Sequence, residues 1–309
     1  MAASAPFAPF ADRLSRFLFE RAAVHGALVS VDDACREILG QHPYPPALRR
    51  ALAELIAAST LLASTLKFKG TLAVQLQGSG PVRLLVVECD AKLNLRATAQ
   101  WRDEAERLPA DAPLSVLAGD SAHSRLAITL DPKDGGPLSQ GIVALEASSI
   151  ATLIDHYLAT SEQIDSRMVL AADGMRVRGL LVQRLPSAGP DDDITWQRAV
   201  GQVAQLEPSA LLRAGTAEEL LAARFRDDDV RVFAPRAVRF RCNCSHERVA
   251  NALRMLGRNE IEGILAEQGM VGVTCEFCNR GYHFVAADAR ALFARPDAGG
   301  DGPPDALRH

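Results

Sequence analysis

Hydrophobic residues recur at three- and four-residue intervals in two segments near the start of the chain, 12–23 and 46–67. This spacing is typical of one apolar helix face, so it predicts a helix in each segment. Pro46 favours a first helical turn and supports the second helix. In the first segment, the residues at helical spacing are Leu14, Phe17, Leu18 and also Arg21.

The pattern changes to short apolar runs and strict alternation between residues 71 and 185, which predicts β-strands. Turn residues at 78–81, 131–136 and 173–174 separate them into hairpins, and a helix is expected over 148–161. Antiparallel strands with helices set apart indicate an α+β fold for residues 1–186, and not a doubly wound βαβ sheet. The expected strands are 71–77, 82–89, 93–101, 125–130, 141–146, 168–173 and 178–185.

Residues 187–235 differ in composition, with nine acidic residues against five arginines. Two helical stretches, 194–206 and 208–225, contain few large apolar residues and are interrupted by glycine and proline. Such helices depend on docking against another surface. We interpret this segment as a metastable helical linker. An ordinary helical hairpin packed on the first domain is an equally consistent interpretation.

Residues 236–295 predict a small α+β domain, and 296–309 a disordered tail rich in glycine and proline. Nine arginines against six acidic residues give the small domain a charge of +3. Ser245 and Asn259 are the expected N-caps of its first two helices. Two short strands flank the CEFCNRG turn, and a last helix follows.

Composition excludes several classes of protein. The chain has 309 residues, 48% of them hydrophobic, and a formal net charge of −4, which suits about two globular domains. A weakly negative chain gives no electrostatic reason to bind nucleic acid. The longest uncharged helical run, 55–66, is shorter than the roughly 20 residues of a membrane span. No signal-peptide pattern begins the chain, so we expect a soluble cytoplasmic protein without a membrane partner.

Four of the six cysteines form a CxC and a CxxC pair: Cys242, Cys244, Cys275 and Cys278. In a reducing cytosol, clustered thiols favour a metal site over a permanent disulfide framework. Residues i and i+2 of an extended chain point to one face, and the CxxC turn is typical of zinc knuckles, where Gly281 is expected to ease the reversal. These four residues therefore predict one structural zinc ion in a closed Cys₄ site.

The other candidate residues receive simpler interpretations. His246 and His283 lie beside the pairs, but four thiolates already saturate the ion, so we expect surface or supporting roles. Cys35 and Cys89 stand alone and are assigned to packing. No catalytic triad, phosphate-binding loop or paired-carboxylate set occurs, so we expect no catalytic residues and no enzyme.

Zinc-bound thiolates are also the form that reacts with oxidants. Oxidation to disulfides removes the ligands, and a structural zinc contributes about 10–16 kcal/mol in small peptides. A domain of this size with a thin core should unfold without it. The residues alone thus suggest a redox switch in which zinc loss leads to local unfolding.

The motifs RCNCSHERV and VTCEFCNRGYHF, together with LSRFLFERAAVHGALVSV near the start, resemble the redox-regulated heat-shock chaperonin family of 33-kilodalton heat-shock proteins. The likeness extends over about residues 12–295. It implies an ATP-independent holdase, inactive when reduced and zinc-bound. It also implies that oxidation forms the disulfides Cys242–Cys244 and Cys275–Cys278, that the linker unfolds, and that a homodimer binds unfolded clients and passes them to ATP-dependent chaperones.

Two alternatives stay open at the level of sequence. The CxxC could belong to a thiol–disulfide oxidoreductase, although a CxC partner and the missing βαβ context argue against it. The basic C-terminal domain could be a zinc-ribbon module that binds nucleic acid or a protein partner, although its arginines are scattered.

Overall fold

The computed structural model describes residues 11–65, 69–133, 135–186 and 190–293. Its elements form the α+β fold expected from the sequence. The chain divides into two compact units, Met1–Cys242 and Asn243–His309. This division does not test the predicted functional segments 1–186, 187–235 and 236–295, which stay predictions. The predicted disordered tail at 296–309 lies outside the described residues.

The first unit contains sheet A, a six-stranded sheet of order β10-β1-β2-β9-β8 in which β11 also pairs with β1. All its pairings are antiparallel. The predicted hairpin over 168–185 is confirmed as β8–β9. The strands are β1 (Arg13–Phe19), β2 (Val24–Val31), β8 (Ser166–Ala172), β9 (Val177–Arg184), β10 (Val230–Val232) and β11 (Arg236–Ala237).

Sheet B is also six-stranded and has the order β12-β5-β4-β3-β6-β7. The strand β12 pairs with β5 in parallel, and the other pairings are antiparallel, including both predicted hairpins. Its strands are β3 (Gly70–Gln77), β4 (Val82–Asp90), β5 (Asn94–Trp101), β6 (Arg125–Pro132), β7 (Ser139–Ala144) and β12 (Arg239–Phe240).

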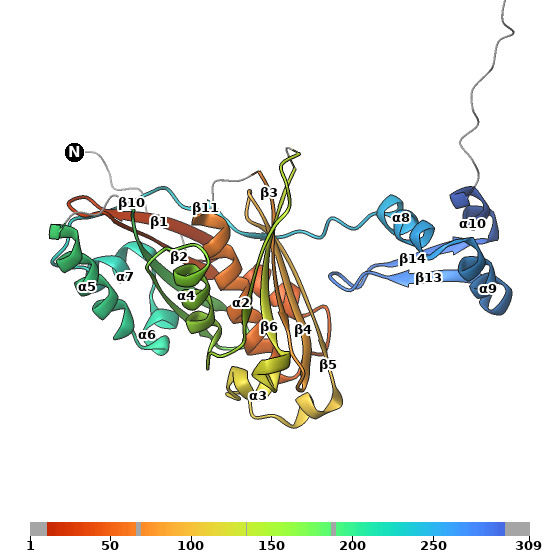
Figure 1. The fold of residues 1–309 in the computed structure, drawn as a ribbon, viewed down its shortest axis with the longest axis horizontal. Helices are drawn as coiled ribbons and strands as arrows, with labels where there is room; N and C mark the ends of the chain where they lie inside the picture. The colour runs from red at the N-terminus through yellow and green to blue at the C-terminus, as the bar shows by residue number, and fades with distance from the viewer. Residues whose placement is uncertain (1–10, 66–68, 134, 187–189, 294–309) are drawn as a thin grey trace, which may run out of the picture. The chain divides into compact units, whose positions relative to one another are not determined.

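The helix α2 (Pro46–Thr65) lies between the two sheets (Figure 1) and is buried around most of its circumference. This confirms the helix predicted for 46–67 as far as the described residues extend. Ser149 caps α4 (Ile150–Thr160) by accepting from Thr152 N, which confirms the helix predicted for 148–161. Shorter helical segments are α1 (Asp33–Leu39), α3 (Leu114–Ala118) and the 3₁₀ turns Asp103–Arg107 and Ser121–His123. Among the described residues, no helix combines the length and apolar character that spanning a membrane requires.

The helix predicted for 12–23 is wrong, because this segment forms β1 and the turn into β2. Leu14 packs in the core shared with α2, whereas Phe17 and Phe19 pack on the opposite face of sheet A. A strand that is buried on both faces loses its polar alternation. The remaining apolar spacing then imitates a helix.

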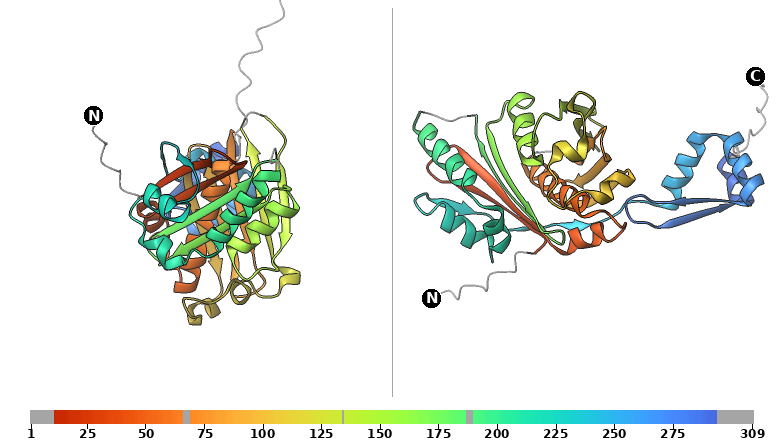
Figure 2. Two further views of the ribbon diagram at one scale, coloured as in Figure 1. Left: turned by 90° about the vertical axis from the view of Figure 1, so that its left-hand side faces the viewer. Right: turned by 90° about the horizontal axis from the view of Figure 1, so that it is seen from below.

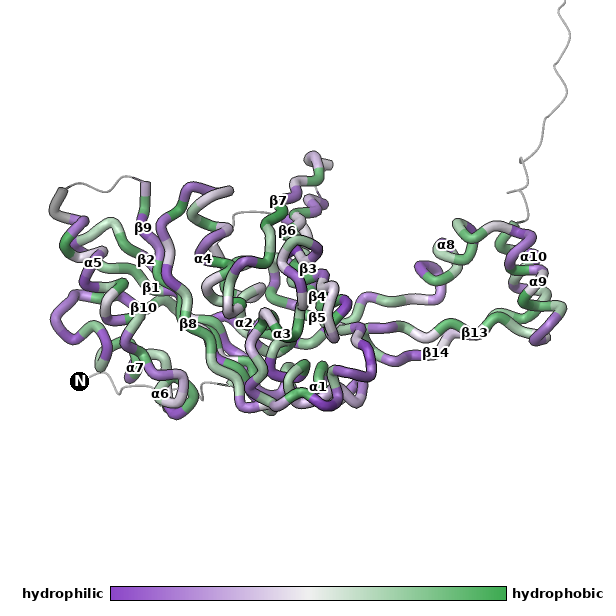
Figure 3. Tube along the Cα trace, turned by 60° about the horizontal axis from the view of Figure 1, so that its bottom comes forward, coloured by the Kyte–Doolittle hydropathy of each residue, from purple (hydrophilic) through white to green (hydrophobic). Residues whose placement is uncertain are grey.

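The second face of sheet A is covered by the helices of residues 190–224 (Figure 2). These helices together form the cover of sheet A. Hydrophobic stretches run along the strands of sheet A (Figure 3), so both faces need cover. Phe225 closes the cover, with its ring centroid 5.1 Å from that of Phe19 and 5.9 Å from that of Phe17. The helices are α5 (Pro190–Ala204), α6 (Pro208–Arg213) and α7 (Ala217–Arg224), so the stretch predicted over 208–225 is two helices.

A buried arginine joins sheet A to this cover. Arg178 on β9 is only 5% exposed, and its Nη1 donates to the carbonyl oxygens of Leu211 (3.1 Å) and Ala214 at the end of α6. Its Nε donates to Ser30 Oγ at 3.3 Å. Cationic side chains stabilise helix C-termini in this way by satisfying the last carbonyl groups.

After α7 the chain runs along the edges of both sheets. The strands β10 and β11 pair with β1, and β12 pairs with β5 of sheet B. Beyond β12, Arg241 N still donates to Leu95 O at 2.8 Å. Residues 190–241 are therefore hydrogen-bonded and packed into the first unit up to the residue before Cys242.

The second unit is small. It contains α8 (His246–Leu256), α9 (Arg258–Gln268), the hairpin of β13 (Met270–Thr274) and β14 (Gly281–Val285), and α10 (Ala286–Phe293). Ser245 caps α8 by accepting from Arg248 N at 3.2 Å, as predicted. The N-cap predicted at Asn259 is wrong, because α9 begins at Arg258 after Gly257. Among the described residues its buried core consists of Ala250, Leu253, Ile261, Val271, Tyr282, Phe284 and Ala289.

Replacing Arg178 by methionine should loosen the cover of sheet A. The substitution leaves the buried carbonyl group of Leu211 and the partly buried one of Ala214 without this donor, which costs about 1–3 kcal/mol. Hydrogen exchange of the amides in α6 and α7 should therefore accelerate by about tenfold to a hundredfold. Arg176→Met is the control, because Arg176 lies in the exposed β8–β9 turn and pairs with Asp173. Equal exchange in both variants would show that Arg178 does not hold the cover.

Candidate metal centre

The two cysteine pairs occupy two different backbone settings. Cys242 and Cys244 follow β12 in irregular chain, and Cys275 and Cys278 lie in the turn between β13 and β14. In that turn Cys278 N and Asn279 N both donate to Cys275 O, at 3.3 and 2.8 Å.

In the turn between β13 and β14, the residue with the left-handed backbone conformation is not the predicted Gly281. Asn279 adopts the left-handed conformation with φ 55°, whereas Gly281 begins β14 opposite Thr274. Asparagine tolerates this conformation because its short polar side chain can form local hydrogen bonds. The prediction that Gly281 eases the turn is therefore wrong.

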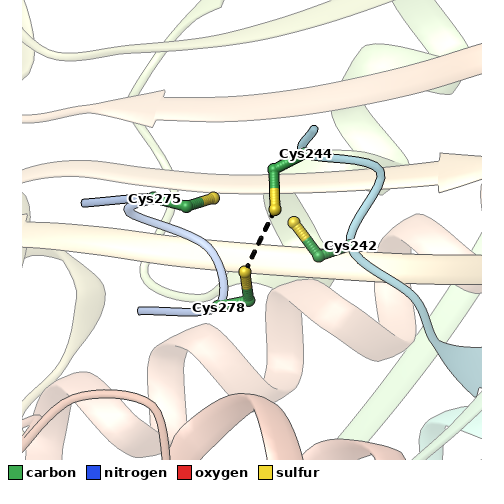
Figure 4. A group of neighbouring side chains, drawn as sticks. All are labelled: Cys242, Cys244, Cys275 and Cys278. Atoms are coloured by element: carbon green, nitrogen blue, oxygen red, sulfur yellow. Dashed lines mark hydrogen bonds between the residues drawn. The ribbon is translucent and has the colours of Figure 1, made fainter. Parts of the chain in front are cut away.

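The four sulfur atoms converge (Figure 4). The Sγ atoms of Cys242, Cys244, Cys275 and Cys278 all lie within 4.8 Å of one another. The Sγ atoms of Cys244 and Cys278, which belong to different pairs, lie 3.4 Å apart. A tetrahedral ion with ligand distances of about 2.3 Å requires sulfur separations of about 3.8 Å. The cluster fits one metal ion, and 3.4 Å is far longer than the roughly 2.05 Å of a disulfide bond.

Two side chains outside the ligand set face the sulfur atoms. The Tyr282 hydroxyl donates to Cys244 Sγ at 3.1 Å, and this hydrogen bond raises the pKa of Tyr282, so the hydroxyl keeps its proton. Arg280 interacts with Tyr282 and with the charges of Cys244 and Cys278, and these contacts raise its pKa. Donors and cations beside thiolates offset their negative charge and orient them.

Sequence reasoning did not identify Tyr282 as a partner of the cysteines. Tyr282 lies opposite Val273 across the β13–β14 hairpin, and its partner Cys244 is 38 residues earlier in the chain. No local spacing signals such a contact.

The neighbouring histidines do not join the group among the described residues. The ring of His246 packs on Phe284 with centroids 4.3 Å apart, and His283 is exposed on β14. These positions agree with the surface or supporting roles expected for both.

The lone cysteines differ chemically from the cluster. Burial raises the pKa of Cys35 to about 12 and the pKa of Cys89 still further, so both remain protonated thiols. Both side chains are fully buried, as the packing interpretation predicts. The four clustered cysteines are only partly buried and are within reach of small oxidants.

The acidic runs of the 190–229 segment also have structural roles that the sequence did not reveal. Asp192 Oδ1 accepts from Ala23 N at 2.7 Å in the β1–β2 turn. Asp193 pairs with Arg184 at the end of β9, and the buried Asp228 carboxylate pairs with Arg198 of α5. These carboxylates stabilise the start of α5 and the chain that follows α7.

The setting of the CxxC pair bears on the oxidoreductase alternative. A reactive CxxC of that class gains its low thiol pKa at a helix N-terminus. Here Cys275 and Cys278 lie between two strands and share one cluster with the CxC pair. The geometry favours a closed four-sulfur ligand set, which leaves no coordination position for a substrate.

Replacing Tyr282 by phenylalanine should weaken metal binding without removing a ligand. Loss of a hydrogen bond to a ligand atom typically lowers metal affinity about 10- to 100-fold. Competition between the reduced protein and a chromogenic zinc chelator measures the change. Tyr157→Phe is the matched control, because Tyr157 donates to Glu162 in the first unit. An unchanged affinity in the Tyr282 variant would contradict a supporting role for its hydroxyl.

Comparison with known proteins identifies the family of the chain. A model of the Hsp33 protein family matches residues 12–285. The 33 kDa chaperonin of Methylobacillus flagellatus is 45% identical over 285 residues, covering 91% of this chain and 94% of that protein. The 33 kDa chaperonin of Azotobacter vinelandii is 40% identical over 303 residues, covering 96% and 99%.

A solved structure shares the fold. The crystal structure of the 33 kDa chaperonin (heat shock protein 33 homolog) from Thermotoga maritima aligns with a TM-score of 0.76 and covers 91% of this chain and 97% of that chain. Its sequence identity is 21%, so this match concerns the fold alone. The family model and the relatives above 30% identity decide the assignment. The chain therefore belongs to the Hsp33 protein family, a family of chaperones.

Proposed function

We propose that this protein is a redox-regulated, ATP-independent holdase that binds unfolding proteins and prevents their aggregation. The reduced, zinc-bound form is inactive, and oxidation activates it. One observation carries the proposal: short edge strands connect the helices that cover an apolar face of sheet A to Cys242, the first residue of the four-sulfur cluster.

The chemistry of the switch follows from the ligand set. Zinc, when bound, holds Cys242, Cys244, Cys275 and Cys278 as thiolates. The family resemblance implies the pairing Cys242–Cys244 and Cys275–Cys278. Forming both disulfides removes four electrons from the four thiolates; two molecules of hydrogen peroxide accept them and, with four protons from solvent, become four molecules of water. The ligands are lost, and Zn²⁺ is released.

Closing the CxC disulfide also moves the backbone. Residues i and i+2 of an extended strand are separated by about 6.6 Å between Cα atoms. Disulfides usually require about 4.4–6.8 Å, with most near 5.5–6 Å. An extended pair lies at the upper end of this range, so formation of Cys242–Cys244 would contract the chain slightly, directly after β12, which ends at Phe240.

A change of the backbone at this position would reach the short edge strands β10, β11 and β12. The strands β11 and β12 have two residues each, and β10 has three. Beyond them, α6 and α7 have six and eight residues, well below the roughly 12–15 at which an isolated helix becomes stable. We therefore propose that the linker predicted at 187–235, together with the edge strands up to residue 241, depends on docking for its order and unfolds when the metal centre opens.

The face that this linker covers is the candidate client-binding surface. Phe17, Leu28, Leu180 and Val182 of sheet A are buried beneath Trp196 and Phe225. Each large apolar side chain contributes about 1.5–3 kcal/mol when it is removed from water. Uncovered, this face and the apolar positions of the unfolded linker would bind the exposed hydrophobic segments of unfolding proteins.

Membership of a chaperone family supports the remaining parts of the proposal. We infer that the oxidised form is a homodimer, that clients pass to ATP-dependent refolding chaperones, and that the protein acts in the cytoplasm on proteins rather than on nucleic acid or membranes.

Light scattering of a chemically unfolded client tests the proposed function. The client is diluted into reduced, zinc-loaded protein and into the same protein treated with peroxide at elevated temperature. Suppression of aggregation only by the treated sample, at near-stoichiometric ratios, is expected. Equal suppression by both samples would exclude redox control, and no suppression by either would exclude holdase activity.

Replacing Cys242 by serine should loosen the linker even in reductant. Loss of a ligand should lower zinc affinity by more than the roughly 100-fold effect of an outer hydrogen-bond partner. Protease cleavage within 190–241 should accelerate accordingly. Cys35→Ala is the control for loss of a thiol outside the cluster, and it should retain full zinc content. Unchanged zinc content and protease resistance in the Cys242 variant would contradict the Cys₄ site.

A further inference from the structure

The strand β7 (Figure 3) is the last strand of sheet B, and among the described residues no strand pairs with its other side. It has six residues, Ser139–Ala144, without a charged side chain or a proline. Its register with β6 contains no bulge. Ile142, near its centre, is 55% exposed. A regular, uncharged edge of this kind can accept a strand from another chain.

One hydrogen bond shows which main-chain groups of β7 face outward. Leu145 N, directly after β7, donates to Ser124 O at 3.1 Å. In an antiparallel pair these bonds occur at every second residue, so residues 143, 141 and 139 also bond to β6. The N–H and C=O groups of Gln140, Ile142 and Ala144 therefore point away from β6. Each of these residues offers one donor and one acceptor to a further strand.

The other edges of the two sheets are short or covered. The strands β10, β11 and β12 have three, two and two residues. Beside β12, residues Ala97, Thr98 and Ala99 of β5 are buried. On β8, Met168 N donates to Asp155 Oδ2 of α4 at 3.2 Å. Proteins protect edge strands by shortness, charge or cover, and among the described edges β7 has none of these protections.

The arrangement of β7 determines the chemistry of a partner. Donors and acceptors repeated at every second residue match the main chain of another extended segment, which can add to the sheet as a strand. Ile142 lies opposite Ala127 of β6, so an added strand would place a side chain on the free side of Ile142. An apolar, β-branched residue packs best at such a position. Arg125, opposite Ala144, disfavours a cation near that end.

Two kinds of chain offer such a segment: the edge of a second folded copy and a flexible stretch of an unfolding protein. Stable contacts between folded proteins use about 20–30 residues a side, whereas β7 offers six. A flexible segment needs no further matching surface. We propose that β7 binds an extended, uncharged apolar segment of an unfolding protein, which adds to sheet B through the main-chain groups of Gln140, Ile142 and Ala144.

This inference rests on the proposed holdase function for the source of the segment. It does not require oxidation, because β7 is exposed while the clustered cysteines are free thiols. One short strand should bind with a Kd on the order of 0.1 mM, too weak to hold a client alone. After activation, a client that also contacts the uncovered face of sheet A would gain from the effective concentration of the second contact, which is about millimolar for a short flexible connection.

A peptide of six alternating valine and threonine residues, with a glutamate at each end for solubility, is the probe. NMR of reduced, zinc-loaded, full-length protein follows the backbone amides. At about ten times Kd, hydrogen exchange of the Gln140, Ile142 and Ala144 amides should slow about tenfold, because bound peptide protects them. The amides of Gly141 and Val143, which bond to β6, should change little. This alternation is the signature of an added strand.

The control peptide has the same side chains but an N-methyl group on every backbone amide, so it cannot donate main-chain hydrogen bonds. It should protect none of the three amides. Equal binding of both peptides, protection without the alternation, or no binding of the first peptide would overturn the proposal. Protection of the same amides by raising the protein concentration without peptide would show that a second copy occupies the edge, which would also overturn it.

Two variants test the position. Ile142→Pro removes the central outward N–H at a site where an edge strand tolerates proline, and it should weaken peptide binding at least about tenfold. Ile142→Lys places a charge on the edge and should also weaken binding. Val116→Lys is the matched control, because Val116 is an exposed apolar residue of α3, outside the sheets, and it should leave the affinity unchanged.

Thermal unfolding shows whether each variant is folded, and the amide pattern of the wild-type protein decides the question if a variant is not. Unchanged peptide affinity in both folded Ile142 variants would place the binding elsewhere and overturn the proposal. The measurements use a peptide and reduced protein, and light scattering of a client uses oxidised protein. Failure of the β7 site and failure of the holdase function are therefore seen in different experiments.

Discussion

Both faces of sheet A are apolar, and the need to cover both is the constraint on which the first unit depends. Consecutive residues of a strand point to opposite sides, so Val29 and Leu181 pack toward α2 while Leu28 and Leu180 pack toward α5–α7. The first cover is a long helix enclosed between two sheets. The second consists of three helices of 15, six and eight residues at the surface of the unit.

The second cover is held by polar contacts between its helices and sheet A. Arg178 satisfies carbonyl groups at the end of α6, and Asp192 accepts from the backbone of the β1–β2 turn. Short strands then attach the following chain to the edges of both sheets, up to the residue before Cys242. The cysteines therefore lie at the end of the segment that covers sheet A and lines the sheet edges, and the switch proposed here depends on this adjacency.

Sheet A also shows two outcomes for buried polar groups. Arg178 finds acceptors in the chain that docks above it. His25 and Gln183 face a cavity instead, and their ring nitrogen and amide nitrogen have no partner among the described residues. The difference is one of face, because Arg178 projects toward the linker helices, whereas Gln183 projects from the opposite face of sheet A, on the side of α2.

The sequence by itself determined the features that depend on local spacing and residue type. The α2 periodicity, the hairpins of sheet B, the Ser245 cap and the cysteine pairs could all be read from neighbouring residues. Only the tertiary structure decided that β1 is a strand, because burial on both faces had erased its alternation. It also decided that 190–224 docks on sheet A and that Tyr282 reaches Cys244. These contacts join residues far apart in the chain, and their partners are selected by packing, which local patterns do not encode.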